Sequence, residues 1–242
     1  HTIKRGSKSS PLLETSVTTF VPKDDNVEIM YVTVRNLSHK ELSLTPYAAI
    51  PIYGRSADNI RDHRNVTSML HRIKTTENGV LVRPTMSFDE KGHRINHKTY
   101  YVCGFTAKGQ SPEGFFPTVE EYIGEGGTFT HPRAVCEKRP GVPASSTAEG
   151  REAMGAFRFQ NLTLLPGDKA AYIILFGVEN EESRIEEICQ KYNTEKKAAD
   201  ALAQTKAHWQ DKVSVGFQTG DKDFDCFMKW VCFQPFLRRL FG

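Results

Sequence analysis

The period of the hydrophobic pattern changes once along this chain, and that change limits the fold more than any other feature. Up to Gly177, apolar residues mostly recur at every second position, and beyond it they recur about every 3.6 residues. Within residues 27–36 the alternation places Ile29 and Tyr31 on one face and Met30 and Val32 on the other. A strand with large side chains on both faces is typical of the middle of a sheet that is covered on both sides. The sequence therefore predicts a mainly β domain followed by helices.

Turn signals and prolines divide the first part of the chain. Pro46 and Pro51 predict that the strand over 41–52 is an edge strand or carries bulges. Asn78-Gly79 predicts the turn of a hairpin. Residues 109–150 are rich in Gly and Pro and are predicted to be irregular, as in segments that cover a site or contact a neighbour. Other strands are predicted over 14–22, 66–76, 80–88, 97–108, 151–160 and 169–178.

Three helices are predicted after Gly177. The first carries an apolar stripe at positions i, i+3, i+4 and i+7, formed by Ile185, Ile188, Cys189 and Tyr192. Asn193 is predicted to cap the second, and a short strand is predicted over 213–218. Asp221 is predicted to open the third, which is apolar nearly all round and therefore has to be buried on all sides.

This last helix predicts a partner domain, because one β-sandwich cannot bury every face of it. Pro235 lies within the apolar pattern and predicts a kink or a helix end near Gln234. The chain starts with His1 and not with Met, which is expected of a piece of a longer protein.

Composition excludes several classes of protein. A net charge of +3, scattered along the chain, does not indicate nucleic-acid binding. No apolar run reaches about 18 residues, and none follows the first five residues, so neither a membrane span nor a signal peptide is expected. The five cysteines are widely spaced and none forms a CxxC pair, which favours reduced thiols in a cytoplasmic protein over disulfides or zinc.

Five segments together resemble the N-terminal part of family 94 glycoside hydrolases, the inverting sugar phosphorylases, and in particular members that act on β-1,2-linked glucans. The phosphorylase part of cyclic β-1,2-glucan synthases is similar as well. The segments are AAIPIYGRSADNIRDHRNVTSMLHRI (48–73), FDEKGH (88–93), EEYIGEGGTFTHPRAV (120–135), GREAMGAFRF (150–159) and DFDCFMKWVCFQPFLRRLFG (223–242).

The resemblance implies an antiparallel β-super-sandwich of the galactose-mutarotase-like type, linker helices and an (α/α)6 barrel. On that pattern, 1–179 is the sandwich, 180–220 holds the linker helices and a returning strand, and 221–242 starts the barrel. The family's catalytic Asp and phosphate-binding residues belong to the barrel, beyond this sequence. The resemblance therefore implies that this chain alone is inactive, with no catalytic residue, no metal and no cofactor. It implies inorganic phosphate as co-substrate, an oligosaccharide acceptor, the barrel as partner domain and a possible homodimer.

Two groups of polar residues are candidates for contact with the sugar. The first is the cluster Arg61, Asp62, His63 and Arg64, expected at an edge of the sandwich between two apolar strands. A structural network of ion pairs at a domain interface explains it equally well, since such networks are as common as binding sites. The second group follows from the resemblance alone, which places Glu121, Thr128 and Arg133, with Glu120, in a loop near the sugar.

Other polar motifs are weaker. Asp89, Glu90, His93 and His97 lack a helical face and a specified third ligand, so a polar turn is preferred over a metal site. Gly124–Gly127 lacks the Lys of a phosphate-binding loop, so its glycines are expected to serve turns with positive φ.

Aromatic residues can pack in the core or stack on sugar rings. Tyr100 and Tyr101 are predicted to lie in the core. For Phe115 and Phe116, in the segment predicted to be irregular, both alternatives stay open.

Two other functions remain possible. One is a free-standing carbohydrate-binding module, which would have no use for an apolar terminal helix. The other is a purely structural or dimerisation domain that never contacts sugar.

Overall fold

The computed structural model describes residues 2–6, 12–54, 64–89 and 92–241. The chain divides into two compact units, His1–Ala199 and Asp200–Gly242. The first unit is a β-sandwich with the first linker helix, and the second is helical. The prediction of mainly antiparallel β structure followed by helices is confirmed.

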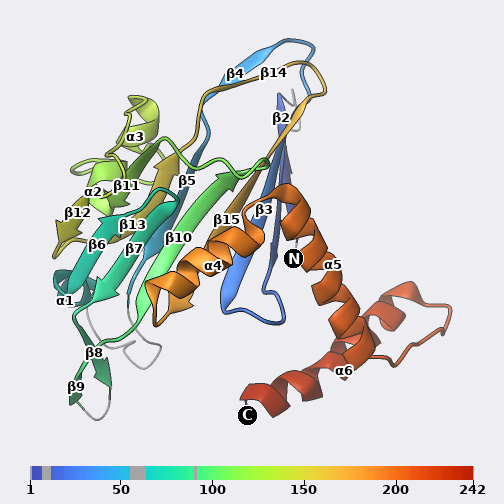
Figure 1. Ribbon diagram of the computed structural model, residues 1–242. Coiled ribbons are helices and arrows are strands. Elements are labelled where there is room, and N and C mark those ends of the chain that lie inside the picture. Colours follow the sequence, from blue (N-terminus) through green and yellow to red (C-terminus); the bar gives the residue numbers. More distant parts are fainter. Residues whose placement is uncertain (1, 7–11, 55–63, 90–91, 242) are drawn as a thin grey trace. The chain divides into compact units, whose positions relative to one another are not determined.

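An eight-stranded antiparallel sheet forms the larger layer of the first unit (Figure 1). Its strand order is β1-β2-β3-β15-β10-β7-β6-β12. The strands are β1 (Thr2–Gly6), β2 (Leu13–Phe20), β3 (Val27–Asn36), β6 (His71–Thr75), β7 (Gly79–Pro84), β10 (Thr99–Thr106), β12 (Thr147–Glu149) and β15 (Lys169–Glu179).

A smaller sheet packs on one face of this layer. It contains β11 (Gly114–Thr118), β13 (Ala153–Arg158) and β5 (Tyr47–Ile52), in the order β11-β13-β5. These strands pack over β6, β7 and β10, behind them in Figure 1. The core between the sheets is aromatic and β-branched, with Val82, Val102, Phe115, Phe157, Phe159 and Ile174 among its buried members.

Helix α4 (Glu182–Tyr192) covers the other face of the large sheet, where it packs on β10 and β15. Since successive side chains of a strand point to opposite faces, Tyr101 and Cys103 of β10 lie on this face while Val102 faces the small sheet. The predicted stripe of α4 is buried, and its Cys189 contacts Cys103. The middle of the large sheet is therefore covered on both sides at β10 and β15. In β3, where the sequence predicted such cover, only Val27, Ile29 and Asn36 are buried, and residues 30–34 are half-buried.

Two short helices cover the outer face of the small sheet. These are α2 (Val119–Ile123) and α3 (Arg133–Cys136). A second apolar cluster, with Phe116, Tyr122, Met154 and Ala156, lies between them and the sheet. Two β-ribbons complete the unit, β4 (Leu42–Leu44) with β14 (Leu162–Leu164), and β8 (Met86–Asp89) with β9 (Gly92–Ile95).

Several sequence predictions are confirmed in detail. β5 is an edge strand, as Pro46 and Pro51 predicted. β6 and β7 form the predicted hairpin, whose turn is closed by the bond from Thr76 N–H to Gly79 C=O, 2.8 Å. Tyr101 is buried and Tyr100 packs against the core between the sheets. Phe115 and Phe116, which had two possible roles, are both buried in the core.

Three predictions of strands and irregular segments are wrong. Residues 66–69 belong to helix α1 (Arg64–Met69) and not to a strand, and the pairing with the neighbouring strand begins only after this helix, where Thr85 N–H donates to Leu70 C=O (2.9 Å). Residues 109–150 are not irregular throughout, since they contain β11, α2, α3 and β12. Residues 213–218 form no strand.

The turn between β14 and β15 is fixed by a buried amide. Asn36 is fully buried at the end of β3, and its side chain donates to the carbonyls of Leu164 (2.9 Å) and Lys40 (2.8 Å). Its backbone N–H donates to Asp168 C=O (2.9 Å), and its C=O accepts from Gly167 N–H (3.0 Å). From Ala171 to Leu175, the strand that follows is buried at every position.

The second unit contains most of helix α5 (Glu195–Lys212) and helix α6 (Lys222–Phe241). Asp221 caps α6 as predicted, accepting from Phe224 N–H (3.1 Å), and the helix continues through Pro235, so a helix end near Gln234 is wrong. Trp209 of α5 packs edge-on against Phe233 at 4.9 Å between ring centroids.

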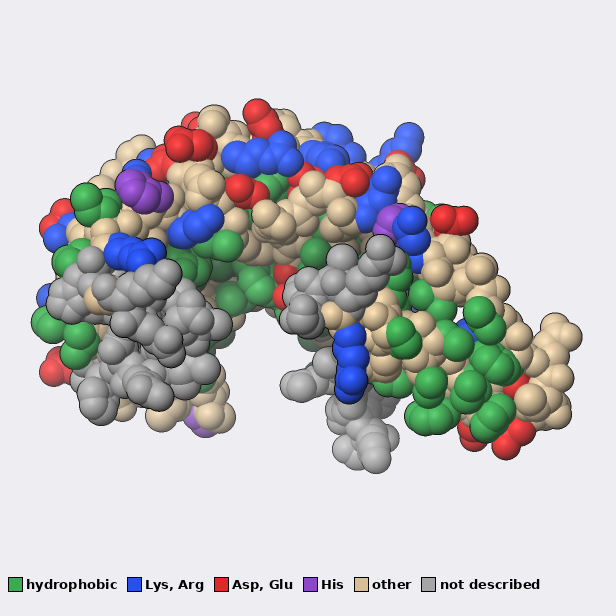
Figure 2. All heavy atoms as spheres, turned by 90° about the horizontal axis from the view of Figure 1, so that it is seen from below, with side chains coloured by type: hydrophobic (Ala, Val, Ile, Leu, Met, Phe, Trp, Pro, Cys, Tyr) green, Lys and Arg blue, Asp and Glu red, His purple; other side chains and the backbone are tan. Residues whose placement is uncertain are grey.

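Helix α6 keeps large apolar side chains exposed. Phe224, Phe227 and Trp230 are 45%, 58% and 55% exposed. Figure 2 shows hydrophobic side chains gathered on the surface of this helical segment, at the right of the view. The part of the chain that the structure describes has no helix that is both long enough and apolar enough to cross a lipid bilayer.

Candidate functional site

Helices α1 and α2, which carry two of the polar residues singled out in the sequence, Arg64 and Glu121, lie at one end of the sandwich. A small cavity of about 30 Å³ lies there between the end of β5, helix α1, the start of β6 and helix α2. Thr67 and Ser68 of α1, Val119 of α2, and Phe129 of the following loop line it, together with His71 and Glu152. A cavity of this size accommodates a water molecule, whereas sites for drug-sized ligands enclose several hundred Å³.

His71 is the buried polar centre of this end. Its side chain is held between two backbone carbonyls, with Nδ1 3.1 Å from Arg151 C=O and Nε2 3.1 Å from Tyr53 C=O. Burial lowers the pKa of His71, and the two carbonyls and the charge of Glu152 oppose this effect without cancelling it. The imidazole lies between the chain after β5 and the residues before β13, and its neutral form is favoured. A neutral imidazole carries one N–H, so it donates to only one of the two carbonyls at a time.

Gly54 makes this arrangement possible. Its φ is +57°, and a Cβ at this position would lie 2.6 Å from His71 Nε2. Both the left-handed backbone and the close approach of the imidazole require glycine. Residues 55–63 follow directly, so Arg61, Asp62 and His63 lie outside the described residues; Arg64 is the first residue of α1.

Glu121 has a structural role in the helix that follows. Thr118 Oγ1 accepts from Glu121 N–H (3.1 Å), and the Glu121 carboxylate accepts from Thr118 N–H (3.2 Å). This reciprocal pair is a capping box, which satisfies free N–H groups at the start of α2. The neighbouring Glu120 is exposed and pairs with Arg151 at 3.2 Å.

Arg133 and Thr128 lie on the loop and helix beyond α2. Arg133 Nε donates to Glu137 Oε1 (2.8 Å), and its side chain packs on Gly124, where a Cβ would lie 2.8 Å from Arg133 Cδ. Thr128 is exposed and forms a bridge with His131. Gly124 and Gly126 have positive φ, as the sequence predicted for this segment.

Helix α1, which Arg64 opens, and helix α2, which carries Glu121, lie at the same end of the fold, because both line one cavity. The sequence missed His71, Phe129 and Glu152 at this place. The sequence did carry a signal for His71, because Met69 and Ile73 on either side of it are apolar. A His at such a position is expected to be buried and therefore to need hydrogen-bond partners.

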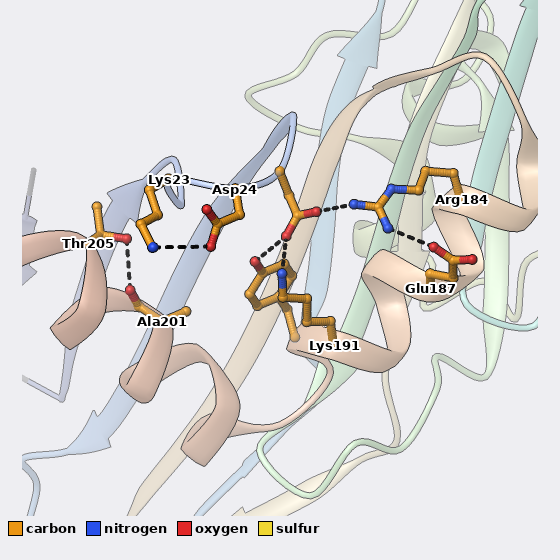
Figure 3. Close-up of polar contacts among 9 residues, drawn as sticks. Lys23, Asp24, Arg184, Glu187, Lys191, Ala201 and Thr205 are labelled. Carbon is orange, nitrogen blue, oxygen red and sulfur yellow. Dashed lines mark hydrogen bonds and ion pairs between the residues drawn. The ribbon is translucent and has the colours of Figure 1, made fainter. Parts of the chain in front are cut away.

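A second polar cluster anchors helix α4 to the sheet. The Asp25 side chain, in the loop between β2 and β3, has no exposed surface and binds Arg184, Lys191 and Tyr192 of α4 (Figure 3). Burial by itself would raise the pKa of Asp25, but the hydrogen bonds from Lys191 and Tyr192 and the charges of Lys191 and Arg184 outweigh it, so the pKa is lowered. α5 is anchored nearby, where Glu195 binds Tyr31 and Lys169 and its N–H donates to Ala107 C=O, 3.0 Å.

These clusters stabilise the fold and do not assemble a reactive centre. The carboxylates of Glu121 and Asp25 form hydrogen bonds and ion pairs that position helices. Within the described residues, no group of three or more His, Cys, Asp or Glu side chains could hold a metal ion. Of the four residues for which a polar turn was preferred over a metal site, Glu90 lies outside the described residues and His97 is exposed.

The fold and this site define a class of protein, a two-layer β-supersandwich with linker helices and without a catalytic constellation in its described residues. Residues 7–195 match the family model described as "Glycosyl hydrolase 94, supersandwich domain". Because the match covers well over half of the 242 residues, the chain belongs to this family.

Two further comparisons add little to the family match. The comparison with curated proteins found no match. A solved structure described as "Polysaccharide Lyase BACCELL_00875" is similar, with 9% sequence identity and a TM-score of 0.39. The match covers 74% of this chain and 21% of that one.

Proposed function

We propose that this chain is the N-terminal, non-catalytic part of a 1,2-β-oligoglucan phosphorylase, a cytoplasmic enzyme that reversibly phosphorolyses β-1,2-linked glucooligosaccharides to glucose 1-phosphate. The observation that carries the proposal is the match of residues 7–195 to the glycoside hydrolase 94 supersandwich family. The resemblance of the five sequence segments to members that act on β-1,2-glucans supports the finer assignment.

The sandwich supports a helical catalytic barrel in this proposal. The exposed apolar side chains of α6, Phe224, Phe227 and Trp230, are suited to packing against further helices of such a barrel. α6 is then its first helix, and α4 and α5 are the linker. Anchoring by Asp25 and Glu195 keeps the start of this linker on the sheet. In this proposal the sandwich also contributes to a homodimer of the enzyme.

The chemistry proposed for the complete enzyme explains why this part needs no carboxylate pair. An inverting hydrolase uses one carboxylic acid to protonate the leaving oxygen and a second carboxylate to activate water. Phosphate is itself a nucleophile, so phosphorolysis needs only the acid, which the proposal places in the barrel. Inorganic phosphate is a co-substrate, and no cofactor takes part.

We propose that the end of the sandwich around α1 and α2 faces the acceptor side of the sugar cleft. In this proposal Arg61, Asp62, His63 and Arg64, the last of which opens α1, contact the acceptor together with Thr128 and Arg133, which follow α2 in the chain. The common cavity of α1 and α2 supports this grouping. Glu121 acts here through the capping box, which keeps α2 and the loop after it in place.

The test compares this chain with the full-length product of its gene. Phosphate release from glucose 1-phosphate is measured with sophorose as acceptor, and with cellobiose and laminaribiose as controls for linkage. Activity with sophorose in the full-length protein only is the expected result. Turnover by the 242-residue chain would overturn the non-catalytic role. Preference of the full-length protein for another disaccharide would overturn the β-1,2 assignment alone, and tight binding of sophorose by the isolated chain would favour a free-standing carbohydrate-binding module.

A further inference from the structure

Two buried cysteines meet where helix α4 covers the large sheet. Cys103 lies on β10 and Cys189 on α4, and the two residues are 1% and 2% exposed. α4 packs on β10 and β15 (Figure 1), and the two thiols share a hydrogen bond across this interface. Neither residue is in a disulfide, and of the five cysteines these two alone are buried. A disulfide within this interface can therefore form only between Cys103 and Cys189.

The closed arrangement of α4 on the sheet protects these thiols from reaction. The hydrogen bond with Cys189 and burial both raise the pKa of Cys103 well above its ordinary value. The thiolate is the reactive form of cysteine, so a buried and protonated thiol is inert. A dissolved oxidant reaches either sulfur only when α4 moves away from β10. The position of the helix therefore determines whether the two cysteines react.

The same interface contains a polar group that favours opening of the helix. Tyr101 is buried on the face of β10 that carries Cys103, and its hydroxyl has no hydrogen-bond partner among the described residues. A buried hydroxyl without a partner costs free energy, which water would restore if α4 lifted from the sheet. Asp25 opposes this movement, because its carboxylate binds Arg184 and Lys191 of the helix (Figure 3). The closed position of α4 therefore depends strongly on the Asp25 anchor.

We propose that Cys103 and Cys189 are a site of reversible oxidation, whose disulfide fixes α4 to β10 when the protein meets a small oxidising disulfide such as oxidised glutathione. The helix opens as a local unit while the sheet stays folded, as low-stability elements of proteins do. In a reducing compartment such a bond is transient and forms under oxidising conditions. Because a disulfide is shorter than a hydrogen bond between thiols, it holds the helix more closely against β10. This inference does not rest on the proposed phosphorylase function.

The oxidation proceeds by two exchanges of thiol and disulfide. Cys189 moves outward with the helix, so its thiolate attacks one sulfur of the oxidant, releases the first small thiolate and forms a mixed disulfide. When the helix approaches the sheet again, the thiolate of Cys103 attacks the sulfur of Cys189 and releases the second small thiolate. The two protons of the cysteines end on the two released thiols. Two electrons pass from the protein to the oxidant, which is reduced to two thiols.

The probe is oxidised glutathione, applied to the 242-residue chain and to a variant with Cys136→Ser, Cys226→Ser and Cys232→Ser. Mass spectrometry of tryptic peptides is expected to find Cys103 and Cys189 in one linked pair, with two hydrogens fewer than the separate peptides, in both proteins. Oxidation of the variant is expected to raise the midpoint of thermal unfolding by at least about 5 °C, and dithiothreitol is expected to reverse this change. Adding Cys189→Ala to the variant is expected to abolish both effects.

The anchor of α4 tests whether opening of the helix controls the reaction. Asp25→Asn is expected to speed formation of the disulfide about tenfold, because a larger fraction of molecules is open at any time. Asp24→Asn, at the exposed neighbouring position, is expected to leave the rate unchanged. Mixed disulfides without the linked pair, a linked pair that forms only in urea, or a midpoint that oxidation leaves unchanged or lowers would each overturn the proposal. Equal rates in the two Asp variants would overturn the control by α4.

Discussion

Lys191 Nζ lies 2.6 Å from Oδ2 of Asp25, so a cation in the last turn of α4 neutralises a carboxylate that has no exposed surface. Arg184, about two turns earlier on the same helix, binds the other oxygen of that carboxylate. A single side chain in the loop between β2 and β3 thus contacts both ends of the linker helix.

Replacing this carboxylate tests how strongly it fixes the helix. Asp25→Asn is expected to lower the free energy of unfolding by about 2 kcal/mol, because hydrogen bonds to a charged group are lost and two cations lose their partner. Lys191 and Arg184 are about half exposed, which limits the loss of stability. Urea unfolding followed by circular dichroism measures it. Asp24→Asn is the matched control, because the side chain of Asp24 is 59% exposed and pairs only with Lys23 among the described residues. This substitution is expected to lower the free energy of unfolding by less than about 0.5 kcal/mol. Equal effects of the two substitutions would contradict the anchoring role.

The pH dependence of stability is expected to report His71. Because burial lowers its pKa below the ordinary 6.5, the unfolded chain binds a proton more readily than the folded one. The stabilisation is complete above about pH 6.5 and is lost as the pH falls toward the folded pKa. The midpoint of urea unfolding should therefore decrease between pH 7 and pH 5 by more in the unchanged chain than in His71→Gln. His97→Gln, at an exposed position, should behave as the unchanged chain does. A midpoint that rises toward pH 5 would mean that the two carbonyls around the ring favour its charged form.

Gly54 provides a test of the contact with the imidazole. Gly54→Ala is expected to destabilise the fold by about 2–3 kcal/mol, because a positive φ disfavours a side chain and the new Cβ would meet His71. Gly126 has a similar φ of +66°, but a Cβ there would meet open space. Gly126→Ala is therefore expected to destabilise the fold by only about 1 kcal/mol. The difference between the two midpoints of thermal unfolding isolates the steric contact. If the two substitutions have the same effect, His71 moves aside without loss.

The capping box predicts that Glu121 matters for stability before it matters for binding. Glu121→Ala is expected to lower the free energy of unfolding by about 1 kcal/mol, because the first turn of α2 loses a partner for a backbone N–H. Glu120→Ala removes an exposed ion pair and is expected to change it by less than about 0.5 kcal/mol. Denaturant unfolding of the two neighbours distinguishes these roles. A stable Glu121→Ala chain would return Glu121 to the group of residues proposed to face the sugar.

The β framework was predictable because its signals are local. Alternation along residues 27–36, the Asn78-Gly79 turn and the prolines of β5 each depend on neighbouring positions, and the structure confirms all three. The helical stripe of α4 was predictable for the same reason.

The sequence predictions failed where residues that are distant in the sequence determine the local structure. Residues 66–69 form a helix, and the pairing with β7 begins only at Leu70, which accepts from Thr85 N–H (2.9 Å); the pattern of residues 66–69 alone does not show where that pairing begins. In the site, the partners of His71 are carbonyls 18 and 80 residues away in sequence, so its role could not be read from the local pattern. The capping box at Thr118 and Glu121 was different, since the spacing Thr-x-x-Glu is visible in the sequence and was overlooked.

The buried run in β15 has a consequence for how the chain selects its own pairing. In a strand with one wet face, slipping by one residue would expose apolar groups, and this penalty fixes the alignment. Between Ala171 and Leu175 both faces are dry and apolar, so such a slip carries little penalty there. The alignment of β15 with β3 therefore depends on the turn at its start, where the Asn36 amide and backbone bind Leu164, Gly167 and Asp168. A single polar residue at the end of one strand thus determines which residues of the next strand face each side of the sandwich.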